Sequence, residues 1–204
     1  MRPRNLLSLS LALALGAFAA PALAQSAGGV RPNLVVVEGL AGAWQSHEKT
    51  GDDDPSNGLS IGSSTTTSLT NQTLRLGYHR VLGPLTLGGG LHYGTYSSVS
   101  HLLLAPRVGG LFGSSGFAIW PRAGLTYART KLDFGGLGAT TTETMAAAEL
   151  LFLAELAPHV GVLFGPGIEL GLSGKQKTES TKSSASEDYK SRVIGVQLGL
   201  FADF

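Results

Sequence analysis

The last twelve residues of the chain read Val193-Ile194-Gly195-Val196-Gln197-Leu198-Gly199-Leu200-Phe201-Ala202-Asp203-Phe204 and alternate between two unlike sets of side chains. One set is apolar and consists of Ile194, Val196, Leu198, Leu200, Ala202 and Phe204. The other set contains Gly195, Gln197, Gly199 and Asp203, with Phe201 as the exception. A period of two residues is typical of a β-strand whose two faces meet different surroundings. The sequence therefore predicts a final strand with one apolar face.

Seven earlier segments show the same alternation, so we expect eight strands in all. Each segment is close to the ~9–11 residues that a tilted strand needs to cross a bilayer. The expected strands cover residues 34–45, 68–80, 85–96, 102–111, 117–131, 142–156, 160–172 and 192–204.

Each expected strand carries large apolar residues on one face and glycine or charged residues on the other. In segment 160–172, for example, Phe164 and Ile168 share one face, and Gly165 and Glu169 share the opposite face. The interior of an eight-stranded barrel is a space that side chains just fill. Small residues with a few charges suit such an interior, and the apolar face then points outward.

Segment 142–156 is the one stretch whose composition also favours a helix, because it is rich in Ala, Leu, Met and Glu. Its glutamates Glu143, Glu149 and Glu155 are spaced six residues apart. This spacing aligns them on one face of a strand and scatters them around a helix. We expect a strand here, with a helix as the alternative.

The connections between the expected strands alternate in length. Tight, turn-forming stretches cover 81–84, 113–116 and 157–159, whereas longer polar stretches cover 47–67, 97–101, 135–141 and 173–191. Short periplasmic turns and longer extracellular loops are typical of transmembrane barrels. The sequence therefore predicts an all-β, eight-stranded, antiparallel, up-and-down transmembrane β-barrel.

Residues 1–24 have the features of a secretory signal peptide, and residues 25–204 form the expected barrel domain. Arg2 and Arg4 precede an apolar run, and Ala22-Leu23-Ala24 provides a cleavage site. The remaining chain carries 13 Lys+Arg and 14 Asp+Glu, a balance that gives no reason to expect a nucleic-acid partner. Because the chain has no cysteine, disulfides, thiol chemistry and a lipoprotein anchor are excluded.

Six charged residues of the expected strands point into the barrel: Glu38, Arg75, Arg107, Arg122, Glu149 and Glu169. Buried charges are very costly unless they are paired or hydrated. The first interpretation is a structural plug of ion pairs. The alternatives are a gate, in which exchange of Arg and Glu partners opens a narrow water path, and a catalytic pair of buried carboxylates.

The sequence predicts no catalytic, cofactor-binding or metal-binding residue. The five histidines, His47, His79, His92, His101 and His159, do not show the spacing of a metal site. The acidic run at Asp52 to Asp54 departs from a calcium loop, since Asn57 stands where such a loop needs glycine.

With these features, residues 34–204 resemble the small outer-membrane β-barrel proteins, the group that includes the transmembrane domain of outer-membrane protein A and the Ail-type adhesins. The resemblance implies a monomer among the lipids of the outer membrane of a Gram-negative bacterium. The ending of the final strand is similar to the signal read by the barrel assembly machinery, which implies a periplasmic C-terminus; its residues are Val196, Leu198, Leu200 and Phe204.

Three functions are compatible with this sequence. The leading one is a non-enzymatic barrel that stabilises the envelope or presents its loops for surface contact, including the form with a narrow gated pore. The second is an outer-membrane barrel enzyme that acts on lipid A or peptides. The third is a soluble, secreted, lipocalin-like binder with its apolar face inside. The surface ligand of the loops is not predicted.

Overall fold

The computed structural model describes residues 31–49, 64–66, 74–114, 116–134, 137–180 and 183–204. The expected signal peptide and the Asp52 to Asp54 run lie outside these residues, as do residues 68–73 of the second expected strand. Among the described residues, no helix is long and apolar enough to span a membrane.

The described residues form eight principal strands and two strands of three residues. The principal strands are β1 (Asn33–Lys49), β3 (Arg75–Leu82), β4 (Leu85–Tyr96), β5 (Val99–Gly110), β7 (Phe117–Phe134), β8 (Leu137–Ala157), β9 (Val160–Ser180) and β10 (Ser183–Asp203). The short ones are β2 (Ser64–Thr66) beside β1 and β6 (Phe112–Ser114) beside β7. Segment 142–156 is part of a strand, as expected, because it lies within β8.

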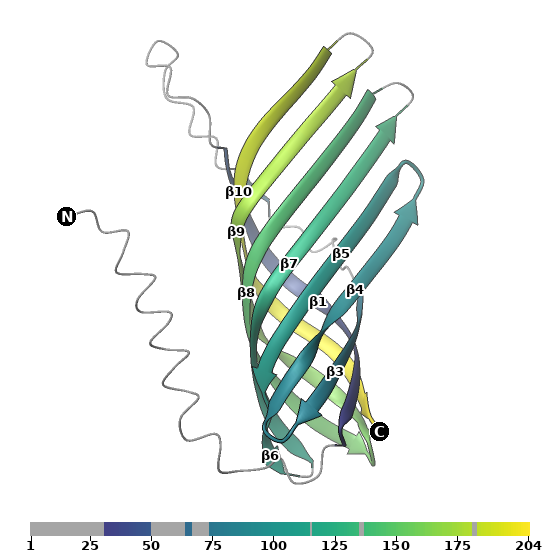
Figure 1. The fold of residues 1–204 in the computed structure, drawn as a ribbon, viewed down its shortest axis with the longest axis vertical. Coiled ribbons are helices and arrows are strands. Elements are labelled where there is room, and N and C mark those ends of the chain that lie inside the picture. Colours follow the sequence, from purple (N-terminus) through teal and green to yellow (C-terminus); the bar gives the residue numbers. More distant parts are fainter. Residues whose placement is uncertain (1–30, 50–63, 67–73, 115, 135–136, 181–182) are drawn as a thin grey trace, which may run out of the picture.

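The sheet closes on itself as an antiparallel barrel. Each principal strand pairs with its neighbour in the chain, and β1 pairs with β10 from Leu34↔Asp203 to Lys49↔Tyr189. Figure 1 shows the short connections at one end, near the C-terminus, and the long paired strands rising to the opposite end. We call these the turn end and the hairpin end. Closure satisfies the backbone groups that an open sheet leaves unpaired at its edges.

Asn33 joins the first and last strands at the turn end. Its backbone N–H donates to the carbonyl oxygen of Phe204 (3.2 Å), and the N–H of Phe204 donates to the Asn33 carbonyl (3.0 Å). The Asn33 side-chain oxygen also accepts hydrogen bonds from Tyr78 and Arg80 of β3, both at 2.7 Å. One residue thereby connects three strands, β3, β1 and β10.

The exterior of the barrel is apolar between the turn end and the start of the hairpins. The large apolar outer residues of β10 and the adjoining Phe204 are about half exposed, from Ile194 (45%) to Phe204 (56%), while Gln197 between them is buried (1%). Leu150 and Phe164 continue this surface on β8 and β9. An apolar band outside and polar residues inside is the arrangement of a barrel in a bilayer. It is the reverse of what the lipocalin-like alternative requires.

The strands at the hairpin end are longer than the sequence predicted. Residues 173–191 were expected as a loop, but β9 continues to Ser180 and β10 begins at Ser183. Similarly, β8 begins at Leu137 and β5 at Val99, within two other expected loops. Outside the apolar band both strand faces are polar, so the hydrophobic alternation disappears while antiparallel pairing continues.

A bulge in β9 lies where the outer surface changes from apolar to polar. Thr144 of β8 pairs with Ser173, but the next residue, Met145, pairs with Gly171, so Leu172 is an extra residue in β9. A register shift at the same height separates Tyr189 from Arg192 in the pairing of β10 with β9. After an extra residue, the outward positions of the strand change from even-numbered to odd-numbered residues, or the reverse.

The interior at the turn end is an apolar core, which we call the apolar plug. It consists of Leu34, Val36, Val81, Leu111, Ala118, Trp120, Leu151, Leu153, Leu163 and Phe201. Trp120 is completely buried and donates its indole N–H to the Thr86 hydroxyl (2.8 Å). The rings of His79 and Trp120 pack in a T-shaped arrangement, with their centroids 4.7 Å apart.

Glycines let the strands approach closely inside the barrel, and β4 offers a matched test of this. A Cβ on Gly88 would lie 2.0 Å from the Tyr78 carbonyl oxygen, whereas one on Gly90 would have its nearest neighbour, the Arg75 Cβ, at 3.5 Å. We therefore expect Gly88→Ala to destabilise the barrel by about 1–3 kcal/mol, the usual cost of overpacking. Gly90→Ala, two residues along the same face, is expected to change stability little.

The measurement is the urea midpoint of both variants in lipid vesicles, followed by Trp fluorescence. Equal midpoints for the two variants would contradict the close approach at Gly88.

Candidate functional site

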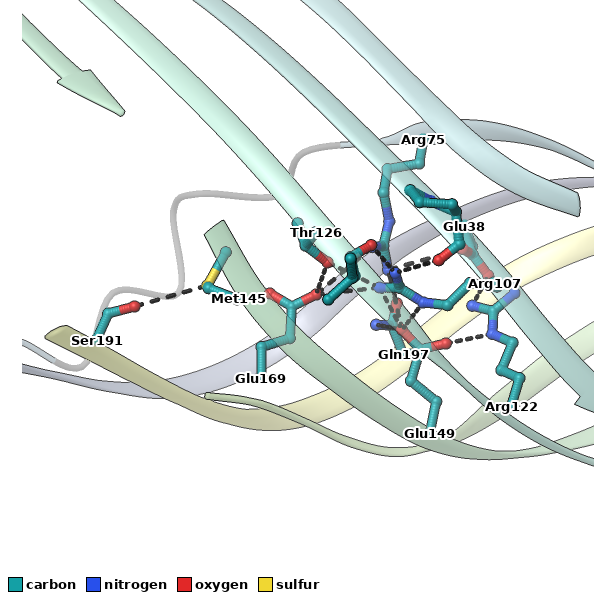
Figure 2. A network of polar contacts seen from close by, with 12 residues as sticks. Glu38, Arg75, Arg107, Arg122, Thr126, Met145, Glu149, Glu169, Ser191 and Gln197 are labelled. Atoms are coloured by element: carbon teal, nitrogen blue, oxygen red, sulfur yellow. Dashed lines mark hydrogen bonds and ion pairs between the residues drawn. The ribbon is translucent and has the colours of Figure 1, made fainter. Parts of the chain in front are cut away.

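The six charged residues expected inside the barrel come together in one cluster, which we call the ion-pair cluster. Each comes from a different strand and points toward the others (Figure 2). They are Glu38 of β1, Arg75 of β3, Arg107 of β5, Arg122 of β7, Glu149 of β8 and Glu169 of β9. The cluster lies between the apolar plug and the hairpin end, and its three arginines balance its three glutamates in formal charge.

Glu149 is the centre of the ion-pair cluster, because it contacts all three arginines. Its carboxylate oxygen Oε1 lies 3.2 Å from Arg107 Nη2 and 3.7 Å from Arg75 Nη2. The other oxygen, Oε2, accepts a hydrogen bond from Nε of Arg122. The Glu149 side chain is completely buried. Buried charges of this kind are tolerated because their partners are equally buried and well oriented.

The other two glutamates extend the cluster to either side of Glu149. Arg122 also pairs with Glu38, which in turn lies 3.6 Å from Arg75. Glu169 lies 3.3 Å from Arg107 and 3.7 Å from Arg75. Each of the three arginines therefore contacts at least two carboxylates.

Strand register makes room for these large side chains by placing glycine across from them. Glu149 is opposite Gly167 of β9, and Arg107 is opposite Gly124 of β7. Glu38 likewise faces Gly199 of β10. Directly opposed residues lie on the same face of a sheet at close range. The missing glycine side chains leave the space that the charged groups occupy.

Two neutral residues that sequence reasoning missed complete the cluster. Gln197 accepts a hydrogen bond from Arg75 (2.9 Å) and donates one to Glu149 (3.3 Å). Thr126 accepts from Arg107 (2.9 Å) and donates to Glu169 (2.8 Å). Both lie on the polar, inward face of their strands. This position in the alternation was the feature of the sequence that could have identified them.

Arg107 and Arg122 are fixed by further contacts outside the carboxylates. Arg107 donates to the backbone carbonyl oxygens of Leu125 and Pro106, at 2.5 and 3.1 Å. The Arg122 guanidinium lies over the Trp120 ring, 4.7 Å from its centroid, a cation–π contact that links the cluster to the apolar plug. Exchange of ion-pair partners would therefore have to break several additional interactions.

A second polar cluster, also missed from the sequence, lies nearer the hairpin end. Glu143 of β8 accepts hydrogen bonds from the hydroxyls of Ser191 and, at 3.5 Å, Tyr189 of β10. On the outer face, Thr144 lies beside Tyr127 of β7 and close to Leu172 of β9, so the cluster lies at the edge of the apolar band.

The histidines do not gather into a site. His79 packs in the apolar plug. His92 and His101 face each other nearer the hairpin end, with ring centroids 5.5 Å apart, and His159 bonds to Asp203 (2.7 Å) at the turn end. No group of three or more potential metal ligands occurs within the part of the chain that the structure describes. The side chain of His47 lies outside it.

The residues of the expected assembly signal lie together on the outer surface of β10 and of Phe204, which directly follows it. Val196, Leu198, Leu200 and Phe204 are each between 46% and 58% exposed. They form part of the apolar band. Their recognition by the assembly machinery stays a prediction.

We expect Glu149→Gln to destabilise the barrel by about 3–5 kcal/mol, because loss of the central carboxylate leaves three buried arginines with only two carboxylates, Glu38 and Glu169. The matched control is Glu155→Gln on the same strand. Glu155 is exposed and accepts a hydrogen bond from the His159 N–H, which glutamine can also accept. Urea unfolding of both variants in vesicles measures the difference, and equal stability would show that the cluster is dispensable.

No protein-family model and no curated protein sequence matches this chain. Its strands are arranged similarly to those in three crystal structures. Neisserial surface protein A (NspA) has a TM-score of 0.47 at 14% identity, with 86% of this chain and 99% of that chain covered. OprG, an outer membrane protein from Pseudomonas aeruginosa, has a TM-score of 0.46 at 13% identity, covering 88% and 99%. Ail, the attachment invasion locus protein of Yersinia pestis, has a TM-score of 0.45 at 10% identity, covering 85% and 99%. The barrel itself is defined by the strand register given above.

Proposed function

We propose that this protein is a non-enzymatic β-barrel of the outer membrane of a Gram-negative bacterium, with its C-terminus in the periplasm. Its role is to stabilise the envelope and to hold paired strands outside the membrane for surface contact. The turn end then faces the periplasm and the hairpin end faces the outside, as in barrels with short periplasmic turns.

The observation that carries this proposal is an interior filled by two successive layers. The apolar plug fills the turn end, and the ion-pair cluster lies next to it. Trp120, Leu34, Leu151 and Leu163 of the plug are at most 1% exposed. A water path through the barrel would have to cross both layers. Exchange of Arg and Glu partners alone does not open the apolar layer, which argues for a plug over a gate.

The same contacts argue against catalysis by the interior carboxylates. Glu38, Glu149 and Glu169 all contact arginines, and Glu149 has three such partners. A general acid or base needs access to a substrate proton. Here the carboxylate oxygens of Glu149 are enclosed by guanidinium groups.

We expect the reconstituted barrel to show only background conductance in planar lipid bilayers. A variant that removes one ion pair without changing the net charge, Glu38→Gln with Arg75→Gln, is also expected to stay at background, because the plug is intact. Heat-dependent migration on gels checks that each preparation is folded. Discrete conductance steps in the wild type, or steps that appear in this double variant alone, would support the gate and overturn the proposal.

Lipid analysis tests the enzymatic alternative separately. A deletion strain is expected to contain the same lipid A species as its parent, in the same proportions. A lipid A species that is lost on deletion and restored by the wild-type gene would establish an enzyme. The lipid A composition of a deletion strain complemented with the Glu149→Gln variant then shows whether the interior carboxylates take part in the reaction.

A further inference from the structure

Basic residues gather on one side of the barrel, directly beyond the apolar band at the hairpin end. They lie on β7, β9 and β10, and we call them the basic belt: Arg129, Lys131, Lys175, Lys177, Lys190 and Arg192. All six are exposed. On the other side of the barrel, the corresponding outer positions of β4 are Tyr93 and Thr95. Among the residues whose side chains the structure describes, the cations beyond the apolar band are therefore concentrated on β7, β9 and β10.

The height of the belt is fixed by the apolar residues that precede it on each strand. On β7, the outer face passes from Leu125 through Tyr127 to Arg129. On β10, Arg192 comes one outer position before Ile194, where the apolar face begins. A cation at this position lies at the level of lipid headgroups when the band lies in the hydrocarbon region.

The bulge in β9 brings Lys175 and Lys177 into the belt. The outer residues of β9 before it are even-numbered, up to Leu172, and those after it are odd-numbered. If β9 alternated strictly through Leu172, with no bulge, odd-numbered residues would stay inward and both lysines would point into the barrel. Their outward position is therefore a product of the fold that strict alternation did not predict.

Strand register builds a shallow groove, lined largely by threonine and lysine side chains, between the cations. Thr142 of β8 lies opposite Arg129 on one side and Lys175 on the other, and Thr140 lies between Lys131 and Lys177 in the same way. The groove has a volume of about 270 Å³, and its polar lining comes from Thr140, Thr142, Thr144, Ser173, Lys175 and Lys177. Ammonium groups and hydroxyls are both hydrogen-bond donors to phosphate oxygens.

The belt keeps an excess of positive charge after its acidic neighbours are counted. Asp188 lies across from Lys175, Glu48 of β1 pairs with Lys190, and Asp133 and Glu179 lie farther toward the hairpin end. Four acidic residues thus stand against six cations. None of the six has an ion pair within 4.0 Å among the residues for which the structure gives side chains.

We propose that the basic belt and its threonine-lined groove bind the phosphate groups of a phosphorylated glycolipid of the outer leaflet, of the lipid A class. Continuity with the apolar band favours a lipid over a soluble ligand, because acyl chains can lie on the band while the headgroup reaches the belt. This inference rests on the proposed orientation, in which the hairpin end faces outward.

The test uses the mature barrel purified in an uncharged maltoside detergent. The probes are bisphosphorylated lipid A, the same lipid after removal of both phosphates, and inorganic phosphate, and native mass spectrometry or calorimetry measures binding. We expect lipid A to bind with an affinity that falls as salt rises. The double variant Lys175→Gln with Lys177→Gln is expected to lose about tenfold or more in affinity, as for two headgroup-level cations.

Two controls separate charge at the groove from charge in general. Lys175→Arg with Lys177→Arg keeps the charge and is expected to keep binding, whereas Arg31→Gln removes an exposed cation at the turn end and is expected to have no effect. The proposal is overturned if the dephosphorylated lipid binds as tightly, if the Gln double variant binds like wild type, or if inorganic phosphate binds as well as the lipid.

Failure of the proposed orientation has a different signature. Lysine-directed labelling of whole cells by a membrane-impermeant reagent should modify Lys175 and Lys177 if the hairpin end is outside. Binding of lipid A in detergent without labelling in cells would overturn the orientation and with it the outer-leaflet source of the lipid. Labelling without binding would leave the orientation intact and overturn the lipid site.

Discussion

The antiparallel pairing of β1 with β10 is the constraint that organises the whole molecule, because a barrel can enter a bilayer only when it has no free edge. Every backbone N–H and C=O in hydrocarbon needs a partner within the protein. Once the first and last strands meet, alternate residues are directed inward or outward all the way round. Asn33 holds this meeting point at the turn end through bonds to Phe204 and to β3. The apolar exterior, the glycine-rich interior and the paired charges all depend on this closure.

Closure also sets the contents of the interior, which divides into layers of different chemistry. The apolar plug buries nonpolar side chains that need no hydrogen-bond partners. The charged groups of the ion-pair cluster are tolerated in the interior only because nearly all of them are paired. Replacing a buried ion network with apolar residues often leaves the stability of a protein unchanged or raises it. The ion-pair cluster therefore does not by itself explain the stability of the barrel. The ion-pair cluster is better explained by a role in specifying the register of the strands. Glu149, Arg107 and Glu38 each sit across from a glycine, and a slip of one residue would move the charge to the lipid-facing side.

The sequence predicted the barrel well because the apolar band imposes alternation wherever a strand crosses it. The inward parity of Glu149, Arg122 and the other charged residues followed from the same rule, and so did the assignment of segment 142–156 as a strand. The contacts among them did not follow, because closure of the barrel and the tilt of its strands decide which residues meet. Gln197 and Thr126 were missed for that reason. Glu143 was missed although it shares parity with Glu149.

The hairpins were beyond prediction from alternation, because polar residues on both faces leave no pattern to detect. The bulge in β9 has a further consequence for how this region can change. Deletion of the extra residue, Leu172, would place inward Gly171 directly before outward Ser173, so strict alternation would return. Lys175 and Lys177 would keep their outward positions, because their pairing with β8 does not involve Leu172. The outer surface therefore depends on the pairing register of β8 with β9, and a slip of that register by one residue would turn both lysines inward.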